Sequence, residues 1–445
     1  MLKTFRIGGI HPPENKLSAG QAIRKIELPA QVVIPLSQHL GAPAKAIVAK
    51  GDEVKVGTLL AEANGFVSAS ISSPVSGKIT KIDTVIDSSG YAKPAIFIEV
   101  IGDEWLPEID RSSDLKRECT LSSNEILEKI KAAGLVGMGG AAFPTHVKLV
   151  PPPDFKAEIL IINGVECEPY LTADHQLMLE KSEEILVGVT LLMKVLNVTQ
   201  AVIGIEANKP DAIKLLTEKA TAYPGIQIQG LKMCYPQGGE KQLIEAITGK
   251  QVAPGTLPIS TGAVVQNIST AFAVYEAVQK NKPLIERVIT VTGKDIVTPS
   301  NLLVRLGTPM RALLEACGGI PPNIGKLIAG GPMMGRSLTN FDTPITKGSS
   351  GILAFNETES LRQPIENCIR CAKCIGVCPI GLEPYLISIV ADQNDWEELE
   401  RLHVMECIEC GCCQFTCPAH RPLLDFCRLG KSKVGALLRQ RAAKK

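Results

Sequence analysis

Eight cysteines near the end of the chain repeat one spacing twice. The pattern Cys-x-x-Cys-x-x-Cys-x-x-x-Cys-Pro begins at Cys368 and again at Cys407. Two intervening residues allow three thiolates to surround one iron–sulfur cubane, whereas the fourth cysteine of such a run ligates the other cluster of a pair. Zinc sites usually contain paired cysteines, and disulfide bonds would not impose this spacing in both copies. The spacing therefore predicts two [4Fe–4S] clusters in a helical domain.

The predicted ligand sets cross between the two copies. One cluster is assigned to Cys368, Cys371, Cys374 and Cys417, and the other to Cys407, Cys410, Cys413 and Cys378. Cys412 would give spacings of one and four residues, so we expect it to be a buried or neighbouring thiol rather than a ligand. Four isolated cysteines are expected to pack as small hydrophobic side chains: Cys119, Cys234, Cys317 and Cys427.

Length and composition limit the class of protein. With 445 residues the chain is long enough for roughly three to four domains. Its fourteen cysteines suit a reducing compartment, and a formal charge of +1 gives no general attraction to nucleic acid. Residues 1–13 lack the apolar core of a signal peptide, and the apolar run at 185–198 is too short to span a bilayer. We therefore expect a soluble, cytoplasmic polypeptide whose membrane contact, if any, is peripheral.

The first part of the chain, residues 1–110, is rich in strand-like runs, at 32–34, 46–48 and 96–100. The stretches 51–61 and 73–79 resemble the barrel-sandwich fold of lipoyl and biotinyl domains. Those carriers attach their cofactor to a lysine at a hairpin tip, but here the tip holds Asn64-Gly65. Asn-Gly makes a tight turn and offers no amine, so the sequence predicts a structural or docking role for this domain.

The middle of the chain alternates strands and helices. A capping box at Ser122 and Glu125 begins a helix that Gly134 ends. Strands are then expected at 158–162, 201–205 and 226–233, the last at an edge, with helices at 182–196, 210–222 and 239–248. This alternation is typical of an α/β layer with a mostly parallel sheet, whose ligands bind beyond the carboxyl ends of the strands.

Glycines cluster immediately after the first of these helices. Gly137-x-Gly139-x-x-Ala142 matches the letters of a dinucleotide fingerprint, but a helix rather than a strand precedes it, which argues against an ordinary Rossmann loop. Either the loop is a packing turn, or its backbone amides press against a phosphate or a flavin. Polar loops at 163–169, 206–209 and 235–240 follow three strands at one edge of the sheet, and they favour a shared ligand pocket.

These loops resemble the motifs of the flavin-containing, NADH-oxidising subunit of respiratory complex I, over residues 134–275. The resemblance implies FMN contacts at Gly137, Gly139, Gly140, Asn163, Glu166, Gly238 and Asn267. It implies NAD(H) contacts at Phe143, Glu168 and Glu240. Val165, Gly239 and Gln266 depart from that subunit's pattern, so fewer polar groups would hold the flavin side chain.

The order of the parts resembles the C subunits of Rnf-type electron-transport complexes over nearly the whole chain. The expected domains are the barrel sandwich (1–110), an FMN- and NAD(H)-binding α/β domain (115–285), a β-grasp module (286–355), the twin-cluster domain (356–430) and a basic tail (431–445). Strands at 288–292 and 326–330, with a helix at 310–317 between them, mark the β-grasp module.

The resemblance implies a peripheral subunit of a membrane-bound, ion-translocating ferredoxin:NAD oxidoreductase on the cytoplasmic face of the bacterial inner membrane. Its expected partners are the other subunits of the complex and ferredoxin or a ferredoxin-like subunit, with no nucleic acid. A flavin belongs in such a chain because it links two-electron hydride transfer to one-electron clusters. Two alternatives remain: a soluble flavin and iron–sulfur reductase similar to cobalamin reductases, and an electron-relay docking module without a working nucleotide site.

The end of the chain is basic. Residues 421–445 contain eight lysines and arginines and one acid, Asp425. Such a segment would bind anionic lipid or an acidic partner, or it would be a solvated helix or a frayed end.

Overall fold

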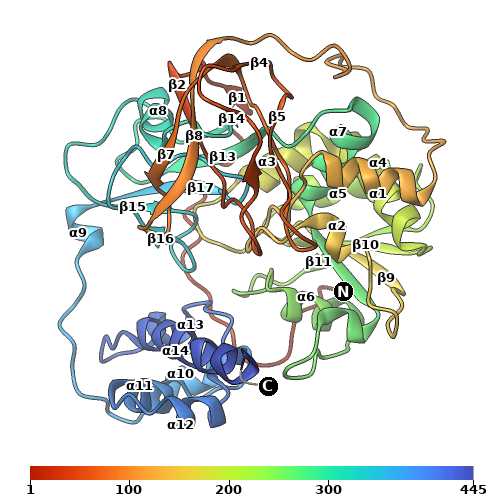
Figure 1. The fold of residues 1–445 in the computed structure, drawn as a ribbon. Coiled ribbons are helices and arrows are strands. Elements are labelled where there is room, and N and C mark those ends of the chain that lie inside the picture. Colours follow the sequence, from red (N-terminus) through yellow and green to blue (C-terminus); the bar gives the residue numbers. More distant parts are fainter. Residues whose placement is uncertain (444–445) are drawn as a thin grey trace.

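The computed structural model describes residues 1–443. Its larger strands form four sheets (Figure 1), two of them in a barrel sandwich, one in an α/β domain and one in a β-grasp module. The C-terminal helices gather in a separate body, coloured blue in Figure 1, beside the loops of the α/β domain. This is the multidomain architecture that the sequence predicts.

The barrel sandwich consists of two small antiparallel sheets. One has the order β2 (Gln31–Pro35), β8 (Ala92–Gly102), β7 (Ser76–Ile86) and β4 (Glu53–Val54); the other has the order β3 (Lys45–Ala46), β5 (Leu59–Glu62) and β6 (Ile71–Ser72). Alternate residues of β2 and β8, such as Val32 and Ile96, are fully buried between the sheets, as expected for strands with one core-facing side. The barrel sandwich lies against the α/β domain, where the Leu40 amide donates a hydrogen bond to the Ala142 carbonyl at 3.2 Å.

Residues before the barrel sandwich extend over the other domains. Lys3 forms a parallel bridge with Leu231 at the edge of the α/β sheet. Ile10 exchanges backbone hydrogen bonds with Tyr235, and β1 (Arg24–Lys25) pairs with the β-grasp sheet. The N-terminal segment thus ties three parts of the molecule together.

The α/β domain contains a four-stranded, wholly parallel sheet. Its order is β11 (Ile226–Leu231), β10 (Ala201–Glu206), β9 (Ile159–Asn163) and β12 (Ala263–Asn267). The three predicted strands and the edge position of β11 are confirmed. The capping box at Ser122 is present, and Gly134 has the left-handed φ of 65° that ends α1 (Ser123–Ala132).

Helices cover both faces of this sheet. The large core on one face includes α4 (Ser182–Leu196) and α7 (Ile268–Lys280), and the smaller core on the other includes α6 (Glu240–Thr248). The remaining helical elements are α2 (Thr145–Lys148), α3 (Ala173–Glu180), α5 (Pro210–Ala220) and the 3₁₀ turn η1 (Pro258–Thr261). The predicted helices at 182–196, 210–222 and 239–248 correspond to α4, α5 and α6.

The β-grasp module has a mixed sheet of the order β1, β14 (Ser300–Arg305), β13 (Glu286–Thr292), β17 (Gly351–Asn356), β15 (Ile324–Ala329) and β16 (Arg336–Ser337). Helix α8 (Met310–Ala316) packs its buried side chains, Met310, Leu313 and Leu314, onto this sheet. The predicted strands and helix are confirmed, and α9 (Glu357–Ser360) leads out of the module.

The C-terminal domain is helical, as predicted. It comprises α10 (Lys373–Gly376), α11 (Pro384–Asp392), α12 (Trp396–Arg401), η2 (Val404–Glu406), α13 (Cys412–Phe415) and α14 (Leu423–Ala443). Helix α14 runs without a break across residue 431, and Arg428, Lys431 and Arg441 form ion pairs with acids of the same domain. Lys444 and Lys445 of the predicted basic tail lie outside the described residues. Within residues 1–443, no helix is both long and apolar enough to cross a bilayer.

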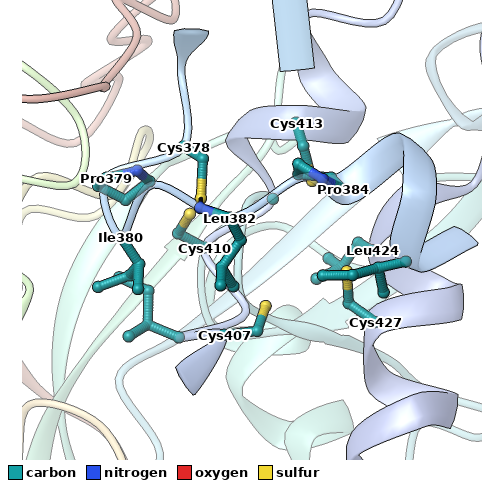
Figure 2. A pocket seen from close by; sticks show the side chains of 13 residues that line it. Cys378, Pro379, Ile380, Leu382, Pro384, Cys407, Cys410, Cys413, Leu424 and Cys427 are labelled. Carbon is teal, nitrogen blue, oxygen red and sulfur yellow. Dashed lines mark hydrogen bonds between the residues drawn. The ribbon is translucent and has the colours of Figure 1, made fainter. Parts of the chain in front are cut away.

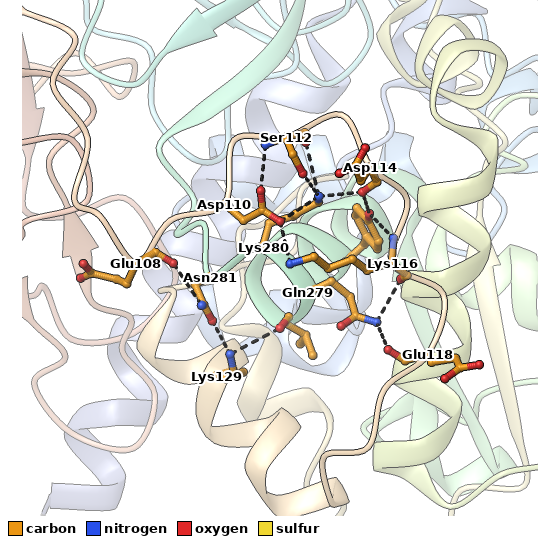
Figure 3. A network of polar contacts seen from close by, with 12 residues as sticks. Glu108, Asp110, Ser112, Asp114, Lys116, Glu118, Lys129, Gln279, Lys280 and Asn281 are labelled. Atoms are coloured by element: carbon orange, nitrogen blue, oxygen red, sulfur yellow. Dashed lines mark hydrogen bonds and ion pairs between the residues drawn. The ribbon is translucent and has the colours of Figure 1, made fainter.

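A polar network fixes the segment between the barrel sandwich and α1. The Lys280 ammonium, at the end of α7, donates hydrogen bonds to the Asp114 carbonyl oxygen at 2.6 Å and to the Asp110 carboxylate at 3.1 Å (Figure 3). Gln279 donates to the carbonyls of Lys116 and Glu118. This connection has no regular secondary structure, but these contacts hold it against the α/β domain.

Lys347 lies fully buried where three domains meet. Its ammonium donates to the Ser70 carbonyl of the barrel sandwich at 2.6 Å and to the Gly134 carbonyl of the α/β domain at 2.7 Å. Burial lowers the pKa of Lys347 to about 7, because a charge away from water is costly without a compensating partner. The β-grasp module thereby holds the start of the glycine-rich loop.

Helices α4 and α7 pack so closely that there is no room for a side chain at Gly188. A methyl group there would lie 1.9 Å from the Ala271 carbonyl oxygen, so Gly188→Ala should destabilise the protein by at least about 2 kcal/mol, near the middle of the usual range for overpacking. Gly435→Ala in α14 is the matched control. The nearest atom would lie 3.5 Å away, and helix propensity predicts a gain of up to about 1 kcal/mol. Thermal unfolding followed by circular dichroism measures both, and equal midpoints would contradict the packing argument.

Candidate functional site

Four cysteines of the two motifs line one cavity in the C-terminal domain. Cys378 comes from the first motif, and Cys407, Cys410 and Cys413 come from the second. Figure 2 shows Cys378, Cys407 and Cys410 turned toward the same space, which apolar residues such as Leu382 and Leu424 enclose. We call these four residues the inner cysteine set.

The other four cysteines line a second, more open pocket. Cys368, Cys371 and Cys374 share it with Cys417 of the second motif. We call them the outer cysteine set; Cys368 and Cys371 are exposed. Each fourth cysteine thus lies with the triplet of the other copy, as the crossed assignment requires, although ligation itself stays a prediction.

The backbone repeats along with the cysteines. Left-handed residues occur at Arg370 and Glu409, at Ala372 and Gly411, and at Gly381 and His420. Each pair is 39 residues apart (409 − 370, 411 − 372, 420 − 381), the same offset as between Cys368 and Cys407. These bends let each triplet curl inward and then turn the chain toward the other set.

The donors fit iron–sulfur clusters better than single metal ions. Within residues 1–443, no group of three His, Cys, Asp or Glu side chains is placed to hold one metal ion. Each cysteine set instead lines a pocket, and four thiolates around one cluster are the usual ligands of a [4Fe–4S] centre. The eight cysteines would hold the two clusters in these pockets.

Two further cysteines lie close to the inner set. Cys412 is fully buried, as expected, and it does not line the cavity. Cys427 packs in an apolar cluster as a small buried side chain, as predicted, and it also lines the same cavity as Cys407 and Cys413. Helix α14 brings Cys427 there from outside both motifs, so the cysteine spacing contained no signal for it.

The glycine-rich loop is held from behind and open in front. The Met138 amide donates to the Thr270 hydroxyl at 2.9 Å, and the Met138 carbonyl accepts from the buried Arg287 at 2.9 Å. Gly139 and Gly140, in contrast, are exposed. A methyl group at Gly140 would meet no atom within 4 Å, so the front of the loop is free to receive a ligand.

The predicted FMN residues beyond this loop meet at the carboxyl edge of the sheet. The Asn163 amide donates to the Gly238 carbonyl at 2.8 Å. The Glu166 carboxylate accepts from the backbone amide of Asp174, at the start of α3, and the Asn267 side chain donates to the Asp174 carboxylate at 2.7 Å. The structure brings these residues together, with their side chains engaged in contacts within the protein.

The three predicted NAD(H) residues have different surroundings. The Glu168 carboxylate accepts hydrogen bonds from the backbone amides of Met333 and Met334 of the β-grasp module, and burial raises its pKa to about 7. Glu240 forms an ion pair with Lys148 at 2.6 Å, and Phe143 is half-buried. Glu168 therefore faces a neighbouring module in this structure.

Two lysines hold the loop that follows β9. The Lys16 ammonium donates to the carbonyls of Glu166 and Glu168, both at 2.9 Å, and burial lowers its pKa. The Lys209 ammonium donates to the Val165 carbonyl at 2.7 Å. Lys209 belongs to a polar loop that the sequence singled out, whereas no pattern pointed to Lys16.

The open edge of the sheet fits a flavin. The Gln266 amide nitrogen at the end of β12 is buried and has no hydrogen-bond partner among residues 1–443, and such a donor is unusual unless a ligand or water meets it. Gly139 and Gly140 leave exposed backbone that a flat ring or a phosphate can approach closely. Together they offer the donors and the close approach that FMN needs.

The inner cysteine set lies directly against this edge. The Tyr235 hydroxyl, three residues before Gly238, donates to the Cys410 carbonyl at 2.9 Å. The Gln242 amide donates to the Pro379 carbonyl at 3.1 Å. Tyr235 and Gln242 both belong to the α/β domain, so the backbone around the inner set contacts that domain directly.

The crossed cysteine sets predict which cluster each serine substitution disturbs. Cys417→Ser should alter or destabilise the cluster of the outer set, because serine is a harder ligand than thiolate, and Cys378→Ser should do the same to the inner cluster. Electron paramagnetic resonance of the reduced protein distinguishes the two signals, with Cys412→Ser as the control that spares both. The assignment is wrong if Cys417→Ser and Cys407→Ser change the same signal.

Four family models match the chain in the order of its domains. They are the RnfC barrel sandwich hybrid domain over residues 3–103, the Nuo51 FMN-binding domain over 130–276, the SLBB domain over 288–337 and the 4Fe-4S dicluster domain over 362–418. A solved NAD⁺-reducing [NiFe]-hydrogenase chain is more distant, with 17% identity and a TM-score of 0.48 over 70% of this chain and 63% of its own. A similarity this low does not bear on function.

Curated relatives are similar over the full length. The C subunit of the proton-translocating ferredoxin:NAD(+) oxidoreductase complex of Clostridium ljungdahlii is 46% identical over 100% of this chain and 97% of its own length. The Na(+)-translocating counterpart of Acetobacterium woodii is 41% identical over 98% of both chains. The C subunit of the ion-translocating oxidoreductase complex of Rhodobacter capsulatus is 40% identical over 97% of this chain and 84% of its own. The chain therefore belongs to the family of C subunits of Rnf-type ion-translocating oxidoreductase complexes, in agreement with the resemblance of its motifs.

Proposed function

We propose that this chain is the subunit through which an ion-translocating ferredoxin:NAD oxidoreductase complex exchanges electrons with NAD(H). The observation that carries the proposal is the hydrogen bond from Tyr235 to the Cys410 carbonyl. It places a loop of the FMN-binding domain against the backbone of the inner cysteine set. Electrons can then pass between the two cofactor sites within a single chain.

Each part of the chain has a distinct task. Bound FMN would supply the exchange between hydride and single electrons, which a cluster alone cannot perform. The residues proposed to hold FMN are Gly137, Gly139, Gly140, Asn163, Glu166, Gly238 and Asn267. Phe143, Glu168 and Glu240 are proposed for NAD(H). Asn267 and Glu166 also cap the starts of α7 and α3, which keeps the edge of the sheet in position.

The positions of the two cysteine sets suggest the order in which electrons pass through the two clusters. The inner set is next to the FMN domain through Tyr235 and Gln242, whereas the outer set includes exposed cysteines. Electrons from NADH would therefore reach the inner cluster first and leave from the outer cluster, and the reverse order holds for reduction of NAD⁺.

We infer a peripheral position on the cytoplasmic face of the membrane, where NAD(H) and ferredoxin are available. The names of the relatives, which are subunits of translocating complexes, support the association with other subunits. The basic residues at the end of the chain support membrane contact less strongly than their number suggested. Arg428, Lys431 and Arg441 are already paired with Glu409 and Glu400, so fewer charges remain for lipid.

Gly140→Val tests the flavin site. The side chain would project into open space, so we expect an intact fold and normal iron content but a loss of FMN, because the ligand needs that space. Flavin released by denaturation is quantified by fluorescence, beside an iron and sulfide assay. Full flavin occupancy in the variant would mean that this loop is only a packing turn.

NADH should reduce both cofactor types in the purified, anaerobic chain with its clusters reconstituted. We expect the flavin and cluster absorbance to decrease together on addition of NADH. In Gly140→Val the clusters should respond to dithionite and not to NADH. Cluster reduction by NADH without flavin, or no reduction in the complete protein, would refute the proposed function.

A further inference from the structure

The inner cavity contains one cysteine more than a cluster needs. Within residues 1–443 it is lined by 13 residues, which are the four cysteines of the inner set, eight prolines, isoleucines, leucines and glycines, and Cys427. A [4Fe–4S] cluster takes four cysteine ligands, and the inner set supplies all of them. Cys427 therefore faces the same cavity as a thiol without a ligand role.

We propose that the Cys427 thiol donates a hydrogen bond to a sulfur atom of the inner cluster or its ligands and thereby raises the reduction potential of that cluster. The inference rests on the proposed function, because it takes the inner set as the cluster site next to the flavin. It adds a residue outside both cysteine motifs to those that decide how readily the inner cluster accepts an electron.

The position of Cys427 allows such a hydrogen bond. The side chain is 1% exposed and reaches the cavity from the second turn of α14 (Figure 2), and Cys407 packs against the same apolar cluster. A buried thiol in apolar surroundings keeps its proton and is a weak donor. The other lining side chains outside the inner set are hydrocarbon or glycine, so sulfur atoms are the acceptors that the side chains of this cavity provide.

Backbone amides already donate to two sulfurs of the inner set. The Leu382 amide lies 3.3 Å from the sulfur of Cys378, and the Glu409 amide lies 3.4 Å from the sulfur of Cys407. Hydrogen bonds to the sulfurs are among the factors that set the potential of a cluster. Reduction adds one electron, so the reduced state is more negative and gains more from each donor. In an apolar cavity this gain is larger than in water.

The other copy of the motif has no thiol at the corresponding place. Helix α11 begins at Pro384 and α14 begins at Leu423, which is the same offset of 39 residues (423 − 384) as between the two motifs. The residue that corresponds to Cys427 is therefore Ser388 (427 − 39). Ser388 is buried, but its hydroxyl donates to the Tyr385 carbonyl at 2.7 Å, and it does not line the outer pocket. The Cys427 thiol thus makes two otherwise similar cluster sites unequal.

Removal of the thiol tests the proposal in the complete chain loaded with FMN and both clusters. Redox titration followed by electron paramagnetic resonance gives the midpoint potential of each cluster, and Cys378→Ser identifies the inner signal. In Cys427→Ala we expect the equilibrium constant for reduction of the inner cluster to fall by about tenfold, or about 59 mV for one electron. The outer potential and the iron content should not change. At a fixed ratio of NADH to NAD⁺, a smaller fraction of the inner cluster should be reduced.

Two further variants distinguish a hydrogen-bond donor from a packing residue. Cys427→Ser keeps the size of the side chain and supplies an O–H, which is a stronger donor than S–H, so the inner potential should stay at or above the wild-type value. Ser388→Ala is the matched control in the other copy. It removes a buried hydroxyl that is bonded within its own helix, and both potentials should stay at their wild-type values.

Four results would overturn this inference while leaving the proposed function intact. An unchanged inner potential in Cys427→Ala would mean that the thiol donates elsewhere, and a lower potential in Cys427→Ser with full iron content would contradict donation by the hydroxyl. Loss of the inner cluster from both variants would make Cys427 a ligand; if only Cys427→Ala loses it, the potential of Cys427→Ser decides. An equal shift of the inner potential in Ser388→Ala would assign the effect to helix packing. Failure of NADH to reduce the wild-type clusters would instead refute the proposed function.

Discussion

The hydrogen bond between the Tyr235 hydroxyl and the Cys410 carbonyl joins the two halves of this redox protein. Tyr235 is buried, and a buried phenol needs a partner for its O–H; here that partner belongs to the inner cysteine set. On its other side, Tyr235 begins the loop that leads to Gly238. One side chain therefore keeps a cluster site beside a flavin site, and burial raises its pKa, so the phenol stays a hydrogen-bond donor.

The domains without redox residues serve to hold this arrangement. Arg287 and Lys347 of the β-grasp module donate to the carbonyls of Met138 and Gly134, at the back of the glycine-rich loop. Both cations are buried, and neither forms an ion pair with a carboxylate within residues 1–443. Backbone carbonyls replace water around them, which makes the burial tolerable. The barrel sandwich completes the junction through Ser70.

The N-terminal segment has a comparable role on the other side of the site. The Lys16 ammonium donates hydrogen bonds to three carbonyls of the loop after β9. The Gly9 amide donates to the Val377 carbonyl, beside Cys378, at 3.0 Å. A single stretch of chain thus contacts both the flavin edge and the inner cysteine set. The barrel-sandwich fold without its carrier lysine is consistent with a role in support.

Local patterns in the sequence determined the elements of this protein. Cysteine spacing predicted the two cluster motifs, alternating apolar runs predicted the parallel sheet, and the Ser122 capping box predicted the start of α1, because each depends on residues within one or two turns of chain. Tertiary structure alone decided that Cys427 joins the inner cavity, that Glu168 faces Met333 and Met334, and that Lys16 supports the flavin edge. Lys16 and Glu168 act across more than 150 positions, and α14 brings Cys427 in from outside the motifs. Only the packing of whole domains creates such contacts.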